Sequence, residues 1–234
     1  MFTLSSVVPW GRSLDEYQRM FALGDAERGL SILGCGDGPA SFNAEATRAG
    51  WRVTSCDPIY QFTAGQLRQR IDETAVSVLE QTRRNAHDFV WTTIPSIDAL
   101  RDTRMSAMHA FLEDYPAGKA DGRYVDAALP ELPFGDGAFD LALSSHFLFL
   151  YTAQLGAAFH RLAIREMCRV AREVRIFPLL ALDGTPSPLA DEAARELAAD
   201  GFIVSVDAVP YEFQRGANRL LCIRRDQRPV QSHA

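Results

Sequence analysis

Apolar residues along this chain occur in two patterns, short continuous runs and stripes that recur at every third or fourth position. Short runs bounded by turn residues predict buried strands, and one-sided stripes predict amphipathic helices. The two kinds of segment alternate, which indicates an α/β fold with a mostly parallel sheet. The predicted strands are the run that starts at residue 31, then 51–56, 123–128, 141–145, 174–177, 202–209 and 218–225. The predicted helices are 13–23, 40–49, two within 61–121, 152–173 and 189–199.

One segment, residues 61–121, is longer than an ordinary connection between two strands and contains two helical stripes. Ser96 is the expected N-cap of the second stripe, and a polar break is expected at 116–122. A length of 234 residues suits one large domain, so we expect 1–234 to form a single domain that contains this helical insertion. We interpret the insertion as a lid or a substrate-recognition element. A helical buttress on the sheet edge is the alternative.

The first predicted strand ends in three glycines at alternate positions, Gly34, Gly36 and Gly38, and Pro39 follows at the start of a helix. Glycine is needed where a turn requires a positive φ or where a ligand approaches the backbone closely. The second predicted strand ends at Asp57. Because ligands of open α/β sheets bind beyond the carboxyl ends of the strands, we expect this carboxylate beside the glycine turn.

The glycine spacing distinguishes between two nucleotide-binding motifs. The dinucleotide fingerprint G-x-G-x-x-G requires glycine at position 39 or 41, and these positions hold Pro39 and Ser41. The alternating pattern at 34–38 instead resembles motif I of the class I S-adenosylmethionine-dependent methyltransferases. Residues 129–145 are similar to a second pattern of that family, in which L-P-F, a short acidic glycine turn and F-D lead into the fourth strand. Both patterns and the acid after the second strand occur in the family's order.

This resemblance implies a doubly wound, Rossmann-like sheet of about seven strands with a terminal antiparallel pair, in three α/β/α layers. It also implies S-adenosyl-L-methionine as the cofactor, with Asp57 bound to the ribose hydroxyls. The cofactor-binding residues that it implies are Gly34, Cys35, Gly36, Gly38, Asp57, Pro58, Ala128, Leu129, Ser144 and Ser145. In such an arrangement the helix that the S-x-x-E capping box at 13–16 begins can fold over the cofactor, so Arg12 and Tyr17 are candidate carboxylate or substrate contacts. A surface arginine and a tyrosine packed on the core are the alternative.

Two positions depart from the family pattern. Ile32 stands where an acid often precedes the first glycine, and Ala128 stands where an Asp often contacts the adenine amine. The adenine is then held either by backbone groups and apolar walls around Ala128 and Leu129, or by Asp126. The two departures support the alternative of a noncatalytic regulatory or interaction module that binds S-adenosylmethionine or a nucleotide.

The candidate for proton transfer is His146, which directly follows the fourth predicted strand. Methyl transfer depends mainly on orientation of the reactants, and it needs a base only where the nucleophile arrives protonated. The ordinary pKa of histidine suits that task. A histidine that packs beside the cofactor or bonds the loop backbone is the alternative. Phe147, Phe149 and Tyr151 are candidates for the wall of a substrate pocket.

Composition narrows the partners and the compartment. The net charge is −6 and no long basic run occurs, which argues against nucleic acid and favours a small-molecule substrate. We expect a cytoplasmic enzyme without membrane contact, because no membrane-spanning stretch or signal-peptide pattern is seen and the four cysteines are interpreted as free thiols. The histidines show no metal-ligand spacing, so no metal is expected, and the oligomeric state is left open.

The sequence therefore favours a methyltransferase that transfers a methyl group from S-adenosylmethionine to an unidentified small molecule. An NAD-dependent oxidoreductase is disfavoured by Pro39 and Ser41.

Overall fold

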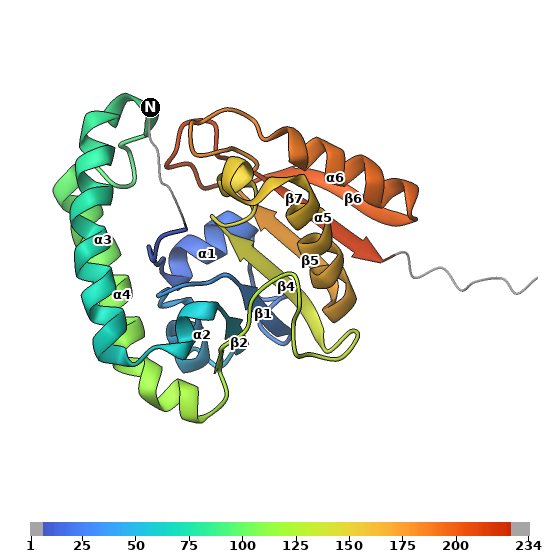
Figure 1. The fold of residues 1–234 in the computed structure, drawn as a ribbon, viewed down its shortest axis with the longest axis horizontal. Helices are drawn as coiled ribbons and strands as arrows, with labels where there is room; N and C mark the ends of the chain where they lie inside the picture. Colours follow the sequence, from blue (N-terminus) through green and yellow to red (C-terminus); the bar gives the residue numbers. More distant parts are fainter. Residues whose placement is uncertain (1–6, 226–234) are drawn as a thin grey trace, which may run out of the picture.

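Seven strands form a single sheet in the order β3-β2-β1-β4-β5-β7-β6 in the computed structural model, which describes residues 7–225 (Figure 1). The strands are β1 (Ser31–Cys35), β2 (Arg52–Cys56), β3 (Tyr124–Val125), β4 (Phe139–Ser145), β5 (Ala171–Phe177), β6 (Phe202–Ala208) and β7 (Arg219–Arg225). Strand β7 is antiparallel to both of its neighbours, whereas the pairs from β3 to β5 are parallel. The predicted seven-stranded sheet with a terminal antiparallel pair is confirmed.

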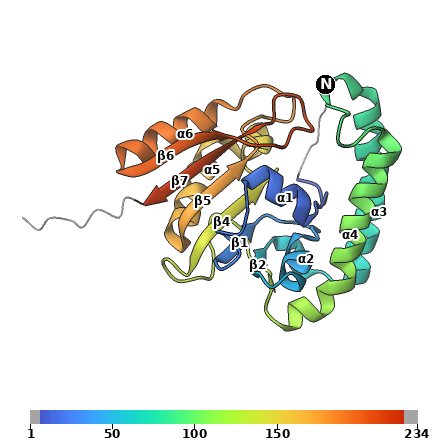
Figure 2. The same ribbon diagram turned by 180° about the vertical axis from the view of Figure 1, so that it is seen from behind.

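Helices cover both faces of this sheet (Figures 1 and 2). They are α1 (Leu14–Phe21), α2 (Phe42–Arg48), α3 (Ala64–Arg84), α4 (Ile97–Ala120), α5 (Thr152–Val170) and α6 (Pro188–Ala199), with short 3-10 helices η1 (Pro58–Gln61), η2 (Ala86–Asp88) and η3 (Phe149–Tyr151). In β1, Ile32 packs with α1 and α2, and Leu33 packs with α5 and α6. Because successive side chains of a strand alternate between its faces, this short apolar strand contributes to both halves of the core.

Helices α3 and α4 lie side by side at the β3 edge of the sheet and make up most of the 61–121 insertion (Figures 1 and 2). Thr63 begins α3 with a capping box, and Ser96 caps α4 as predicted. Several aromatic and aliphatic side chains of both helices form a buried cluster with Tyr60 and Tyr124. This cluster packs the helical pair against the sheet edge.

The sequence predicts a polar break that begins at Pro116, but α4 continues across this residue. A proline inside a helix removes one backbone hydrogen bond and usually kinks or ends the helix. Here tertiary contacts hold the turn around it: the Tyr115 hydroxyl donates to the backbone oxygen of Tyr60 at 2.7 Å, and the Lys119 ammonium bonds the same oxygen. Packing outside the helix therefore overrides the local preference.

Two further boundaries differ from the sequence prediction. Strand β3 consists only of Tyr124–Val125, because the chain leaves β2 after this pair and enters the loop that leads to β4. Helix α5 ends at Val170, and β5 begins at Ala171 rather than at Val174. Ala171 is buried and fits both the helical stripe and the alternation of the strand, so the apolar pattern alone does not locate this boundary.

Candidate functional site

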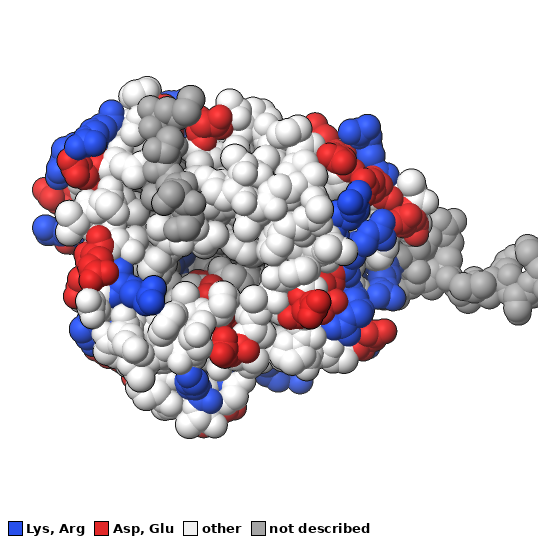
Figure 3. All heavy atoms as spheres, in the orientation of Figure 1, with Lys and Arg blue, Asp and Glu red and all other residues white. Residues whose placement is uncertain are grey.

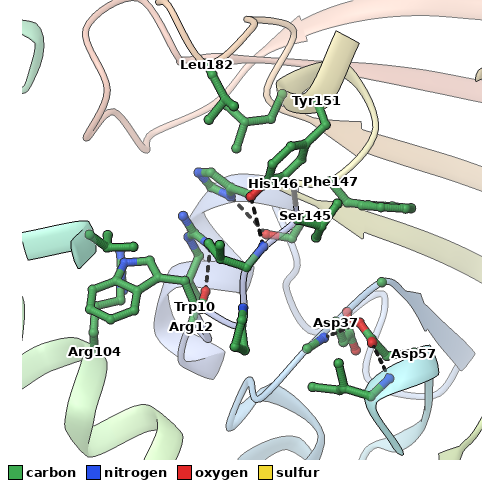
Figure 4. A pocket seen from close by; sticks show the side chains of 18 of the residues that line it. Trp10, Arg12, Asp37, Asp57, Arg104, Ser145, His146, Phe147, Tyr151 and Leu182 are labelled. Carbon is green, nitrogen blue, oxygen red and sulfur yellow. Dashed lines mark hydrogen bonds between the residues drawn. The ribbon is translucent and has the colours of Figure 1, made fainter. Parts of the chain in front are cut away.

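A cavity of about 380 Å³ lies at the carboxyl ends of β1, β2 and β4, where the strand order reverses (Figure 4). Open α/β sheets bind ligands at this place, and the volume is typical of small-molecule sites. The walls are formed by the glycine turn after β1, the start of η1, the loops after β3 and β4 and the segment before α1, and α3 and α4 add a further wall. Within residues 7–225, no group of three or more His, Cys, Asp or Glu side chains is placed to hold a metal ion.

Two of the three glycines in the turn, Gly34 and Gly36, have no room for a larger side chain. Gly36 has a φ of +69°, and a Cβ there would lie 2.8 Å from the Cδ1 atom of Phe147. A Cβ at Gly34 would lie 1.8 Å from the carboxylate of Asp37, which folds back over it. Gly38 has a φ of +58° with no atom near its missing side chain. Steric exclusion therefore explains the first two glycines, and backbone conformation explains the third.

Asp37 is a buried carboxyl at the base of the turn. It accepts hydrogen bonds from the Tyr17 hydroxyl at 2.8 Å and the Ser55 hydroxyl at 2.6 Å. Burial raises the pKa of Asp37 to about 6, against the opposing effect of both hydrogen bonds and with a further contribution from the charge of Asp57. Tyr17, a candidate contact in the sequence, thus lines the cavity and donates to Asp37, the residue between Gly36 and Gly38.

Asp57 lies beside the glycine turn, as the sequence predicts. One carboxylate oxygen accepts from the backbone N–H of Gly38 at 2.9 Å, and the other accepts from the N–H of Ile59 at 2.9 Å (Figure 4). Burial raises the pKa of Asp57 to about 6, although both backbone bonds favour the charged form. The carboxylate therefore fastens the turn after β1 to the first residues of η1.

The loop after β3 supplies an apolar wall. Ala127, Ala128 and Leu129 line the cavity, whereas Asp126 is exposed and is not part of the wall. Of the two interpretations for adenine, this placement favours the apolar surface. Asp126 acts on the site only at a distance, since its charge raises the pKa of Asp57.

Most of the other residues that the sequence singles out also line the cavity. They are Arg12, Tyr17, Gly36, Gly38, Pro58, Ser145, His146, Phe147 and Tyr151. Gly34, Cys35, Ser144 and Phe149 do not line it. Cys35 and Ser144 are fully buried in strands. Because side chains alternate along a strand, Ser145 faces the cavity and Ser144 faces away from it, so no cavity contact is available to the Ser144 side chain.

His146 has an unusual backbone conformation for a residue other than glycine, with a φ of +51°. Its N–H donates to the backbone oxygen of Phe177 at 2.7 Å, and its Nδ1 lies 3.0 Å from the Ser145 hydroxyl. Burial, together with the positive charges of Arg12 and Arg104, holds the pKa of His146 well below its ordinary value. The imidazole therefore stays neutral to a lower pH than an ordinary histidine, and it is a weaker base.

Two arginines meet on the side of the cavity opposite the glycine turn (Figure 4). Arg104 of α4 is 1% exposed, and its Nη1 donates to Glu16 at 2.5 Å. Glu16 also accepts from the Tyr211 hydroxyl at 2.9 Å. Burial acts to raise the pKa of Glu16, but the charge and hydrogen bond of Arg104 outweigh it and lower the pKa to about 2. Arg12 donates to the backbone oxygen of Trp10 and forms no ion pair within the described residues.

The comparisons with known proteins agree with this architecture. No protein-family model matches the chain. The chain is 33% identical over 224 residues to the uncharacterized protein MJ0045 of Methanocaldococcus jannaschii, covering 95% of this chain and 98% of that protein. This chain belongs to the MJ0045 family.

Among solved structures, the MJ0045-family chain is similar to the mitomycin 7-O-methyltransferase MmcR, with a TM-score of 0.50 and 17% identity over 91% of this chain and 54% of that chain. It also matches magnesium protoporphyrin IX methyltransferase (ChlM) from Synechocystis PCC 6803, with a TM-score of 0.49 and 13% identity over 91% of this chain and 78% of that chain.

The similarity to MmcR shows the fold. The MJ0045-family protein has the Rossmann-like fold of the class I S-adenosylmethionine-dependent methyltransferases, with seven strands and the antiparallel β7. The resemblance found in the sequence is confirmed at this level.

Sequence reasoning missed two residues of the site, although each left a signal. Asp37 lies between two glycines of the motif, in a chain where Ile32 occupies the position of the family's usual acid. Arg104 is four residues after Leu100 and four before Met108, on the apolar stripe of the second inserted helix. An arginine on a stripe that faces the core is a buried arginine, and a buried arginine needs partners.

Proposed function

We propose that this MJ0045-family protein transfers a methyl group from S-adenosylmethionine to a small-molecule acceptor. The observation that carries the proposal is the hydrogen bond that joins the glycine turn to Asp57. The Gly38 N–H donates to Asp57 at 2.9 Å at the carboxyl ends of two adjacent parallel strands of a class I methyltransferase fold.

The residues around this unit fit the parts of the cofactor. Each oxygen of Asp57 accepts one backbone hydrogen bond and retains a lone pair for a ribose hydroxyl. Ala128 and Leu129 offer an apolar surface to the adenine. Asp37, beside the bare backbone of Gly36, would hold the ammonium group of the methionine part.

The bound cofactor supplies an electrophilic methyl group on a sulfonium. The chain's own contribution is to bind, orient and move one proton. His146 lines the same cavity as the glycine turn and the two arginines. Its Nδ1 is engaged with Ser145, while Nε2 makes no hydrogen bond within residues 7–225. We assign Nε2 as the atom that accepts the proton of the acceptor's nucleophile, and the neutral state of the imidazole supports this role.

We also propose a cytoplasmic location and a small-molecule partner. The helices within residues 7–225 include none that is long and apolar enough to cross a membrane. All four cysteines are buried and free, which supports a reducing compartment. On the face drawn in Figure 3, acidic and basic side chains of the described residues are interspersed, which supports a small-molecule partner over nucleic acid.

Calorimetry with adenosylhomocysteine and with NAD tests the proposal on the wild-type chain. We expect binding of adenosylhomocysteine and no comparable binding of NAD, and the reverse ranking overturns the proposal. Transfer of labelled methyl groups from S-adenosylmethionine to a set of small-molecule acceptors then separates an enzyme from a noncatalytic binding module. A chain that binds the cofactor and labels no acceptor supports the module.

A further inference from the structure

The buried guanidinium of Arg104 is only partly paired. Its Nη1 donates to Glu16, but Nε and Nη2 are buried and have no hydrogen-bond partner within residues 7–225. Buried donors of a charged group that lack partners cost free energy, so native structures rarely retain them without a reason. Because Arg104 lines the cavity, a ligand bound there can supply an acceptor.

The two unpaired nitrogens have a particular geometry. Nε and Nη2 form one edge of the planar guanidinium, and their N–H groups point in parallel. This edge matches the two oxygens of a carboxylate, which accepts both hydrogen bonds together. Since Glu16 occupies the third nitrogen, Nη1, the position of the plane is already fixed before a ligand arrives.

The local charge also favours an anion. Arg12 and Arg104 contribute two positive charges, and Glu16 is the carboxylate that forms an ion pair there among the described residues. Burial and the charge of Arg104 both lower the pKa of Arg12, as expected for two cations in one buried site. The Nε of Arg12 is also buried without a partner within residues 7–225. Arg12 therefore has no carboxylate in an ion pair with it among the described residues.

The surroundings indicate what else the ligand contains. Val78, Leu100 and Trp10 line the cavity with Arg104, and these residues lie outside the glycine turn and its acid. Figure 4 shows Arg104 and Trp10 on one side of the cavity and Asp37 and Asp57 on the other. Arg104 thus lies at the end of the cavity that the proposed cofactor-binding residues do not line.

We propose that Arg104, assisted by Arg12, binds the carboxylate of the methyl acceptor, and that the acceptor is an apolar or aromatic carboxylic acid. This inference rests on the proposed function. The carboxylate serves as the anchor, and the nucleophile is a separate group of the same molecule.

The probe is 1-naphthoate, with its neutral amide 1-naphthamide as the reference, titrated calorimetrically into the full chain with and without adenosylhomocysteine. We expect the wild type to bind the acid about 10- to 100-fold more tightly than the amide. Arg104→Lys retains a positive charge for Glu16 but loses the paired edge, so this preference should fall about 10-fold or more. Arg12→Met, which breaks no ion pair, should reduce it less. Arg101→Met, an exposed change on the same helix, is the control and should leave it unchanged.

Three results overturn the inference. One is equal affinity of the acid and the amide in the wild type. Another is a preference that Arg104→Lys does not change while the variant is shown to be folded by circular dichroism. The third concerns the methionine carboxylate of the cofactor: if Arg104→Lys weakens adenosylhomocysteine but not 5′-methylthioadenosine, which lacks that carboxylate, the arginine binds the cofactor.

Failure of the proposed function looks different. A wild type that binds no adenosylhomocysteine but discriminates naphthoate from naphthamide retains the anion site and rejects the methyltransferase assignment.

Discussion

Asp57→Asn should weaken cofactor binding and leave the fold almost as stable as before. The substitution keeps the shape of the side chain but removes the charge and one acceptor oxygen. A hydrogen bond to a charged group contributes about 1.5–3 kcal/mol, so loss of one ribose contact should raise the dissociation constant of adenosylhomocysteine about 10- to 100-fold.

The effect on stability combines two opposing contributions. A pKa raised from 3.8 to about 6 means that the buried charge of Asp57 costs the folded state about 3 kcal/mol at neutral pH. Asparagine removes this cost but leaves one of the N–H groups of Gly38 and Ile59 without its acceptor, at a cost of about 1–3 kcal/mol. The two contributions nearly cancel, so the free energy of unfolding in urea should stay close to that of the wild type.

Calorimetry with adenosylhomocysteine and urea denaturation, both at pH 7.5, measure the two quantities. Asp72→Asn is the control, because Asp72 is exposed and lies outside the cavity wall, and the affinity of this variant should remain near the wild-type value. An Asp57→Asn chain with unaltered cofactor affinity would refute the reasoning, since the acid would then serve only to hold the glycine turn.

Further predictions concern the base, the turn, the insertion and the pH dependence. His146→Ala should leave cofactor affinity nearly unchanged while turnover falls about 10²–10⁴-fold, and the wild-type rate should decline at low pH as the imidazole is protonated; normal turnover by the variant removes the base assignment. Gly36→Val should abolish cofactor binding in calorimetry without unfolding the chain by circular dichroism, because a Cβ would intrude where the ligand meets the backbone. Hydrogen exchange in 61–121 should slow when cofactor and acceptor are both bound, and unchanged exchange would favour a buttress throughout. The pKa values of Asp37 and Asp57 are raised in the folded state, so the folded chain binds protons at a higher pH than the unfolded chain. The free energy of unfolding should therefore rise as pH falls from 7 to 5, by about 1 kcal/mol for each carboxyl. Asp37→Asn should reduce this rise, as measured by urea denaturation.

Much of the architecture follows from local patterns. The capping box at 13–16, the N-cap Ser96 and the alternating glycines each specify a local conformation through nearby backbone groups, and the structure contains all three where the sequence predicts them. The position of Asp57 beside the glycine turn was predictable for a related reason, because the carboxyl ends of adjacent parallel strands lie at the same edge of the sheet.

The features that the sequence did not reveal depend on contacts between distant residues. Pro116 remains helical because Tyr115 bonds a carbonyl far away in the sequence. Arg175 is a buried strand residue that pairs with Glu27 and Glu173, and Glu27 lies far from it in the sequence. No local pattern shows which acids will surround an arginine after folding.

One short helix touches both ends of the cavity. Glu16 and Tyr17 are consecutive residues of α1. Glu16 accepts a hydrogen bond from Arg104, and the Tyr17 hydroxyl donates one to Asp37. A small rotation or translation of α1 therefore changes both ends at once, and the two ligands are energetically coupled wherever either one moves it. Such coupling is reciprocal: the factor by which cofactor alters the affinity for acceptor equals the factor by which acceptor alters the affinity for cofactor. For the two proposed ligands, this coupling would be a property of α1, a helix of eight residues.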